Sequence, residues 1–187
     1  TLNPTWSPDS KWVAYSSRLR SLYHAIFISN VETGESKQVT DGLSDARWPV
    51  WDANGKYLWF LASTNFGLRS QWLDMTSYDR NPTYGLYLAI LKKGDPSPLL
   101  PESDEDKGAG TPAAPAGEGG GRRPASPVTV QVDLDDIGKR IISIPGVPER
   151  QYSSLSAGPE GTVFYLEASG TGQGPGGGNT LHRYRLS

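Results

Sequence analysis

The chain has 187 residues, which is enough for one ordinary domain or for part of a larger one. Its formal net charge at pH 7 is −2, which argues against a nucleic acid or an anionic membrane surface as the main partner. The chain has no cysteine, so disulfides and thiolate metal sites are excluded, and no apolar run approaches the ~20 residues of a membrane helix. These features fit the cytoplasm, with the periplasm or secretion as the alternative.

Two stretches near the start of the chain repeat one another, PTWSPDSKWVAYS at 4–16 and PVWDANGKYLWFL at 49–61. In each, a short apolar run, a turn and a second run of aromatic and branched residues predict a β-hairpin. The offset of 45 residues aligns Trp6 with Trp51. Similarity at this period indicates a repeat architecture, and we expect the two tryptophans to occupy equivalent buried positions between repeat units.

The first unit contains four short predicted strands, at 4–6, 12–16, 22–30 and 36–40. Turn residues interrupt every helical candidate before it reaches helix length. Four short antiparallel strands in about 45 residues describe one blade of a β-propeller. The first blade is therefore expected over about 3–42.

The second blade is expected over about 46–100. Its third strand, at 86–91, aligns with 26–31 at an offset of 60 residues, so the blade carries a net insertion. The insertion, at 64–83, is long for a blade, and long loops tend to be functional or mobile. Residues 98–100 are predicted to close the blade.

The rest of the chain departs from the regular period. From 101 to 127 the composition is acidic and then rich in glycine, alanine and proline, which indicates a flexible linker. An extra hairpin is predicted over 128–145, either as an addition to the second blade or as a degenerate blade. A third copy of the hairpin turn, at 158–161, begins a third and incomplete blade over about 152–187. The predicted fold class is all-β, a propeller fragment of about three four-stranded antiparallel blades.

The phrase PTWSPDSKWVAY, at 4–15, resembles the propeller repeats shared by the TolB protein and the tricorn protease. The stretch VDLDDI at 132–137, followed by Arg140, Pro145 and Tyr152, is similar to the segment that joins blades in tricorn-type peptidases. In that family, two propellers precede a PDZ domain and a serine-peptidase domain, and the propellers act as channels or filters for peptides.

The resemblance runs from Asn3 to about Leu166. It implies the non-catalytic propeller part of a tricorn-like serine peptidase, which would scaffold and gate or orient peptides toward a catalytic domain outside this segment. A TolB-like protein-docking module and the propeller of a prolyl-oligopeptidase-type hydrolase are the alternatives. In all three cases we expect the chain to be a segment of a longer protein.

The resemblance also implies the partners. These are peptides or unfolded polypeptide and the other domains of the parent chain, and neither a nucleic acid nor a membrane is expected. Homo-oligomerisation is left open, and no cofactor is expected. An open arc of three blades leaves faces uncovered, so the isolated segment is expected to associate rather than to form a closed monomer.

We identify no catalytic, cofactor-binding or metal-binding residue in the sequence. The two histidines, His24 and His182, are expected to be structural, because no G-x-S-x-G elbow accompanies them. The run of Asp133, Asp135 and Asp136 is more typical of a solvated turn than of a calcium loop, since no glutamate stands at the distal position.

The best candidates for a contact surface lie in the insertion of the second blade. They would face a peptide or a neighbouring domain, and they are Phe66, Arg69, Trp72 and Tyr78. An aromatic loop that only covers a blade edge is the competing interpretation.

Overall fold

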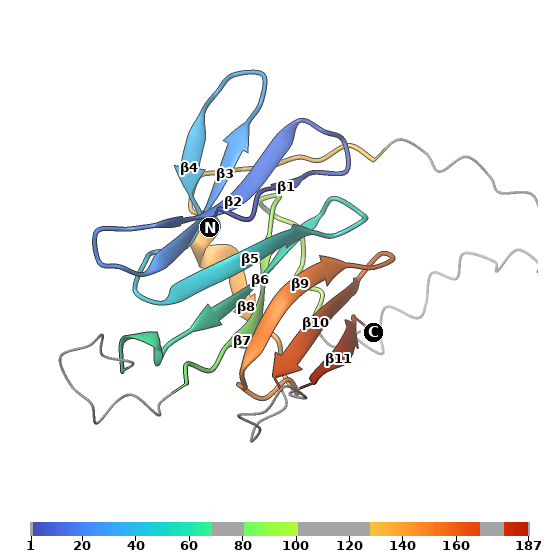
Figure 1. The fold of residues 1–187 in the computed structure, drawn as a ribbon. Coiled ribbons are helices and arrows are strands. Elements are labelled where there is room, and N and C mark those ends of the chain that lie inside the picture. Colours follow the sequence, from blue (N-terminus) through green and yellow to red (C-terminus); the bar gives the residue numbers. More distant parts are fainter. Residues whose placement is uncertain (1, 69–80, 101–127, 169–177, 187) are drawn as a thin grey trace, which may run out of the picture.

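The computed structural model describes four stretches of the chain, residues 2–68, 81–100, 128–168 and 178–186. Within these stretches the fold consists of three antiparallel β-sheets and short 3-10 turns (Figure 1). In this part of the chain no helix is long and apolar enough to cross a membrane. The prediction of an all-β fragment with about three blades is confirmed.

Each sheet is one blade whose strands follow one another in chain order. Blade 1 contains β1 to β4, with the bounds Thr5–Trp6, Trp12–Arg18, His24–Asn30 and Ser36–Gln38. Blade 2 contains β5 to β8, with the bounds Asp45–Trp51, Tyr57–Ser63, Gly85–Ile90 and Ile141–Ser143. Blade 3 contains β9 to β11, with the bounds Tyr152–Ala157, Thr162–Ala168 and Asn179–Arg185. The first strands of the blades lie side by side, with β5 between β1 and β9 (Figure 1).

The turn after the first strand of each blade needs a residue with positive φ. Ser10 in blade 1 has a φ of 60° and Gly55 in blade 2 has a φ of 71° at the same turn position. Gly55 has a second reason to be glycine, because a Cβ there would lie 2.8 Å from a methyl group of Val130 and 2.9 Å from one of Val128. The hairpin turn therefore also determines how closely a distant part of the chain approaches blade 2.

The third hairpin is one residue shorter than its counterparts. In blade 2 the amide of Asp52 donates to the carbonyl of Tyr57, whereas in blade 3 the amide of Gly158 donates to the carbonyl of Thr162. An alignment that matches the three turns must therefore be shifted by one residue for the strand that follows the third turn. Because side chains alternate between the two faces of a strand, this shift decides that Tyr165 faces blade 2.

Blade 2 is apolar on both faces. Leu58 and Phe60 of β6 pack against blade 1, whereas Trp59 and Leu61 pack against blade 3. All four side chains are at most 1% exposed. Fully burying one such side chain contributes about 1.5–3 kcal/mol, so the strand is stable only with a sheet on either side. We call these two contacts seam 1, between blades 1 and 2, and seam 2, between blades 2 and 3.

Hydrogen bonds cross both seams beside the apolar packing. In seam 1, the indole nitrogen of Trp51 donates to the carbonyl of Thr5 at 3.0 Å. In seam 2, the carboxylate of Asp52 is 1% exposed and accepts from the indole of Trp59 at 2.9 Å and from the amide of Gly161 at 3.0 Å. A buried carboxylate without donors is costly, so Asp52 favours the packed arrangement of blades 2 and 3.

The hairpin predicted over 128–145 does not form. Residues 128–134 form no strand, and β8 pairs with β7 as the fourth strand of blade 2. Residues 98–100, which were predicted to close the blade, form a turn instead. Pro98 has no amide hydrogen to donate to the ladder, whereas β8 supplies isoleucines to both seams.

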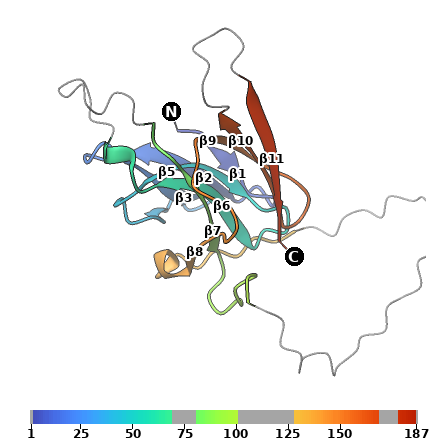
Figure 2. The same ribbon diagram turned by 90° about the horizontal axis from the view of Figure 1, so that it is seen from below.

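The segment before β8 instead covers seam 1. Val130 and Ile137 are buried in the seam, and the amide of Val130 donates to the carboxylate of Asp9 at 2.9 Å. The amide of Asp133 donates to the carbonyl of Leu91 at 3.0 Å. In Figure 2, β8 and the 3-10 turn η4, Ile137–Arg140, lie at the outer edge of blade 2.

Trp6 does not occupy the buried position predicted for it. Trp51 is 3% exposed because it faces blade 1, whereas Trp6 is 59% exposed. At this position of the repeat, the tryptophan is buried only when another blade packs against the face that carries it. No sheet within the described residues covers that face of blade 1.

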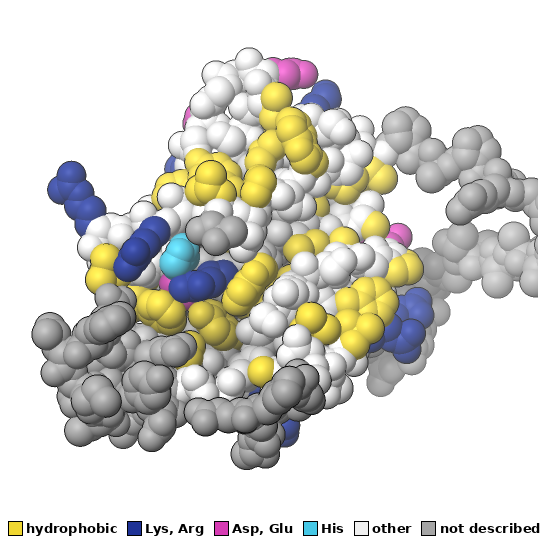
Figure 3. Space-filling view, viewed as in Figure 1, with side chains coloured by type: hydrophobic (Ala, Val, Ile, Leu, Met, Phe, Trp, Pro, Cys, Tyr) yellow, Lys and Arg dark blue, Asp and Glu magenta, His cyan; other side chains and the backbone are white. Residues whose placement is uncertain are grey.

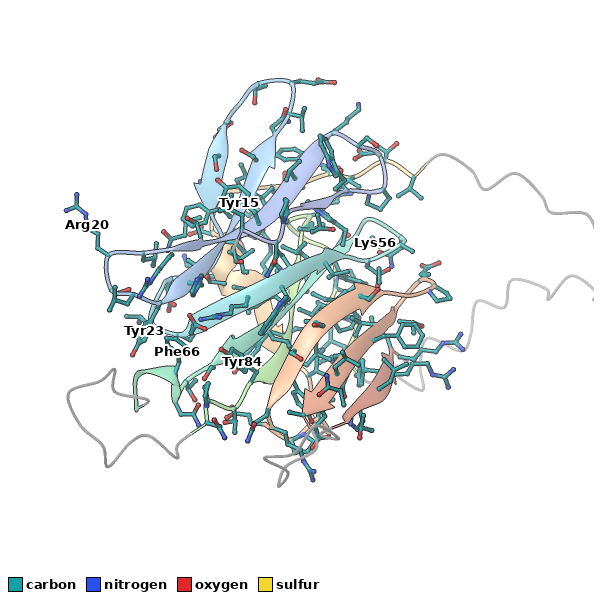
Figure 4. All side chains as sticks on the ribbon, viewed as in Figure 1. Tyr15, Arg20, Tyr23, Lys56, Phe66 and Tyr84 are labelled. Carbon is teal, nitrogen blue, oxygen red and sulfur yellow. The ribbon has the colours of Figure 1, made fainter. Side chains whose placement is uncertain are left out.

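The outer face of blade 1 nevertheless has the chemistry of a seam. Tyr15 and Phe27 stack with their centroids 5.5 Å apart, and Tyr15 is labelled in Figure 4. The repeat alignment matches this pair with Phe60 and Tyr87, which stack at 5.8 Å inside seam 1. The face that carries Trp6 thus reproduces the aromatic content of a packed blade face.

Replacing Trp51 by alanine is expected to lower the free energy of unfolding by about 3–5 kcal/mol, as large core truncations do. The matched variant Trp6→Ala removes the same side chain from an exposed position and should change that free energy by only about 0.5 kcal/mol. Chemical denaturation of both variants measures the difference. Equal losses, or a loss at Trp51 under about 1 kcal/mol, would contradict the seam assignment.

Alkaline pH should weaken seam 2. Burial, followed by the charges of Tyr152 and Glu167 when ionised, raises the pKa of Tyr165 from 10.0 to about 12. The folded state therefore holds the phenol proton more tightly than the unfolded state, and this stability is present below pH 10 and lost between pH 10 and about 12. Denaturation curves across this window should show the loss, and Tyr165→Phe should reduce it. If Tyr165→Phe leaves the pH dependence of the free energy of unfolding unchanged, a different group is responsible for it.

Candidate functional site

A residue with positive φ lies in or just before the first strand of each blade, and in blades 2 and 3 it lies at a β-bulge. Asn3, Trp48 and Ser154 stand at corresponding positions of the repeat and have φ values of 42°, 52° and 55°. The pairing of β5 with β6 and of β9 with β10 shifts its register at these residues. Bulges re-aim side chains and leave backbone groups unpaired, and positive φ at a residue other than glycine stores strain. All three blades carry such a residue in or next to their first strand, which we call the inner strand.

Asn3, Trp48 and Ser154 all line one surface depression of about 570 Å³, which we call the inner-strand hollow. Its lining consists of residues 3–5, 48–50 and 154–157, so each blade contributes the same part of its repeat. The ring of Trp48 is held edge-on against Tyr84, with centroids 5.5 Å apart. The hollow therefore combines fixed apolar side chains with backbone that the bulges take out of the strand ladder.

A second depression of about 500 Å³, the arginine hollow, lies where β2 ends and β3 and β5 begin. Two serines, Ser16 and Ser17, belong to its lining. Its other lining residues are two arginines, a histidine and three apolar residues, namely Arg18, Arg47, His24, Leu2, Leu22 and Phe66. Figure 3 shows a histidine between Lys or Arg side chains on this face, with hydrophobic side chains around them.

A fully buried carboxylate organises the arginine hollow. One oxygen of Asp45 accepts from the backbone amide and from the ring Nδ1 of His24, both at 2.8 Å. Its other oxygen accepts from Nε of Arg47 at 2.6 Å and from the hydroxyl of Tyr84 at 3.0 Å. The side chain of Asp45 is 0% exposed, so these four donors replace its hydration. The network joins β3, β5 and the start of β7.

The guanidinium of Arg47 is held in one orientation. Besides its bond to Asp45, it lies 5.1 Å from the ring centre of Phe66 and 6.0 Å from that of Trp48. Cation–π contacts of this kind fix the plane of the group as well as its position. Its side chain is 26% exposed and lines the hollow.

Asp45 and His24 reproduce two members of a serine-hydrolase triad but not its third. A triad needs a nucleophile hydrogen-bonded to the free ring nitrogen of the histidine and placed on an exposed turn. Ser16 lies inside β2, is 1% exposed, and donates to the carbonyl of Leu2 at 3.3 Å. Ser17 lies on the opposite face of the strand from Ser16. Among the described residues, no serine hydroxyl is hydrogen-bonded to the ring of His24.

The sequence-based contact candidates fall partly within the described residues. Phe66 lines the arginine hollow, and its ring packs edge-on against Tyr23 at 5.8 Å, as the labelled side chains in Figure 4 show. Arg69, Trp72 and Tyr78 lie outside the described residues, as does the linker predicted over 101–127. The proposal that this insertion forms a contact surface therefore rests on Phe66.

Sequence reasoning missed Asp45, Arg47 and Tyr84. A local signal was present, because Asp45 and Arg47 are two residues apart in an otherwise apolar strand and therefore share one face. Charged residues at alternate positions of a buried strand must be paired. His24 and Tyr84 are far from Asp45 in the sequence, so only the fold brings these partners to it.

The acidic turn and the second histidine have structural partners. Asp135 pairs with Lys37 at 2.8 Å and Asp136 pairs with Lys139 at 3.0 Å, and these lysines hold the pKa of both carboxyls below its usual value. His182 stacks on a tyrosine of blade 3. Within the described stretches, no group of three or more His, Asp or Glu side chains is arranged to hold a metal ion.

Comparisons with known proteins support the fold. No family model matches the chain, and no curated protein matches it by sequence. Among solved structures, the tricorn protease superposes with a TM-score of 0.63 at 22% identity, over 98% of this chain and 17% of that one. TolB from Acinetobacter baumannii superposes with a TM-score of 0.50 at 14% identity, over 99% of this chain and 29% of that one. The fold is therefore that of a tricorn- or TolB-like propeller segment, and the chain spans less than a third of either protein.

Proposed function

We propose that this chain is a non-catalytic propeller part of a tricorn-like serine peptidase. It would scaffold the parent protein and gate or orient peptides toward a catalytic domain outside the segment. The observation that carries the proposal is the inner-strand hollow, which three blades build from the same part of the repeat. The likeness to the tricorn protease supports it independently.

The inner-strand hollow has the chemistry that an extended peptide needs. A peptide presents backbone donors and acceptors together with side chains of varied size. The register shifts interrupt the strand pairing beside Trp48 and Leu155, and these two side chains supply apolar contact. Because the strained residues are held by packed blades, the surface is ordered before a peptide arrives, which lowers the entropic cost of binding.

The arrangement of polar groups supports a non-catalytic role. The carboxylate of Asp45 is occupied by four donors, and one of them, Arg47, compensates its charge. A serine nucleophile activated by this histidine would instead need its hydroxyl within hydrogen-bond reach of the ring. Ser16 lies on the same face of blade 1 as His24, but it is buried and donates to a backbone carbonyl.

Peptide binding at the inner-strand hollow can be tested with a single fluorescent label. The chain has no cysteine, so Thr5→Cys and Ser156→Cys each create a unique attachment site at the hollow. Thr33→Cys places the same label on an exposed turn of blade 1 and serves as the matched control. A mixture of unstructured peptides should change the fluorescence at Thr5 and Ser156 and leave Thr33 unchanged. Equal responses at all three positions, or none, would contradict the proposal.

The same samples test the absence of catalysis. Fluorogenic peptides incubated with the chain should be cleaved only at the blank rate. Cleavage that persists through purification and disappears in a His24→Ala variant would show that the dyad with Asp45 is catalytic. That result would overturn the non-catalytic assignment.

A further inference from the structure

We propose that the arginine hollow binds an organic carboxylate. The donors are the guanidinium groups of Arg47 and Arg18, and the wall against the rest of the ligand consists of Phe66, Leu2 and Leu22. This site is distinct from the inner-strand hollow, since the two lining sets have no residue in common.

The first argument is that Arg47 is pre-organised as an anion donor. Asp45 engages only Nε, at 2.6 Å, and the rings of Phe66 and Trp48 hold the guanidinium plane. Among the described residues, neither terminal nitrogen of Arg47 donates a hydrogen bond. These two nitrogens form a planar fork that matches the two oxygens of a carboxylate. Little side-chain entropy remains to be lost when a ligand binds.

The second argument is the charge balance of the hollow. Within the described residues, Asp45 is the only acid with a hydrogen bond or ion pair to a lining residue, and the charge of Arg47 compensates it. Arg18 adds a further positive charge at the end of β2, directly opposite His24 in the strand register. Arg18 is exposed and has no ion-pair partner within the described residues. The described residues of the hollow therefore carry more positive than negative charge, which favours an anion of low charge.

The third argument is the apolar wall. Leu2 is 58% exposed and Leu22 is 45% exposed, and both line the hollow beside the ring of Phe66. Exposed leucines next to two arginines favour a ligand that carries an apolar group beside its carboxylate over a bare inorganic anion. Leu22 has a φ of 71°, so its placement at the rim costs backbone strain.

Three sources share this ligand chemistry. They are the terminal carboxylate of a peptide, an acidic side chain next to an apolar residue, and a small aromatic or aliphatic acid. The peptide form of the proposal rests on the proposed function, whereas the small-acid form does not. The experiment therefore includes a probe for each source.

Binding can be measured by fluorescence anisotropy with a labelled hexapeptide that ends in phenylalanine with a free carboxylate. The controls are the same peptide with an amidated end, the same amidated peptide with an internal glutamate, and 3-phenylpropionate as an unlabelled competitor. The free-acid peptide should bind about tenfold more tightly than its amide, because a charged hydrogen-bond pair is lost. 3-Phenylpropionate should displace it, and added salt should weaken binding.

Two substitutions of neighbouring arginines locate the site. Arg18→Gln should weaken binding of the free-acid peptide about tenfold, because Arg18 lines the hollow. Arg20→Gln removes the same charge two residues away and should leave binding unchanged, since Arg20 is exposed and points away from the body in Figure 4. Both residues are exposed, so both variants should melt like the parent chain. Arg47→Lys keeps the charge but loses the fork and should also weaken binding.

Several outcomes overturn the proposal. Equal weakening by Arg18→Gln and Arg20→Gln would show non-specific charge attraction, and equal binding of the acid and amide peptides would show that no carboxylate is recognised. Binding of 3-phenylpropionate that depends on Arg18, without binding of any peptide, would uphold the carboxylate site and count against the proposed peptide function. Failure of every probe to bind would reject the carboxylate site. It would not decide the proposal for the inner-strand hollow, which the fluorescent labels at Thr5 and Ser156 test.

Discussion

The structure depends on burying both faces of blade 2. The strand β6 is apolar at six successive positions, and its side chains alternate between seam 1 and seam 2. A sheet with one polar face needs a neighbour on one side only, whereas this sheet would expose about half of its apolar residues if either neighbour moved away. The three blades are therefore coupled through the middle one.

Polar groups in the seams add specificity to this coupling. Asp52 reaches from the hairpin turn of blade 2 to the amide of Gly161 in blade 3, and the same carboxylate holds the indole of Trp59. Asp45 plays the corresponding part at the other end of β5, where it joins His24 and Tyr84. Each carboxylate is fully satisfied only when the blades pack in one register, which disfavours slipped arrangements. Both hollows lie on this rigid frame.

Local chemistry made the hairpins predictable. Gly55 at its turn, followed by an aromatic and branched strand, predicts the second hairpin, and the repeat alignment extends this to blade 1. The exposure of Trp6 was not predictable in this way, because burial depends on the sheet that lies opposite and not on the residue. The fourth strand of blade 2 was assigned to residues 98–100 for a similar reason. Ile141–Ser143, which was predicted to belong to an extra hairpin, follows a long excursion and joins the blade through tertiary pairing.

The candidate site was less predictable than the fold. Phe66 was recognised from its place in the insertion, and Asp45 and Arg47 left a local signal in the alternation of β5. Their contact with His24 and Tyr84 requires three strands to meet, and no sequence spacing encodes it. The one-residue difference in the third turn likewise changes which side chains of β10 face seam 2, although the turn itself was recognised.

Native-state hydrogen exchange on β6 tests the central claim most directly. If both faces of blade 2 are locked by its neighbours, the amides of Tyr57–Ser63 should exchange only through global unfolding, with the full free energy of unfolding. Amides of the edge strand β4 should exchange through smaller openings at lower free energy. Exchange of β6 at the same low free energy as β4 would show that blade 2 opens independently and would contradict the account.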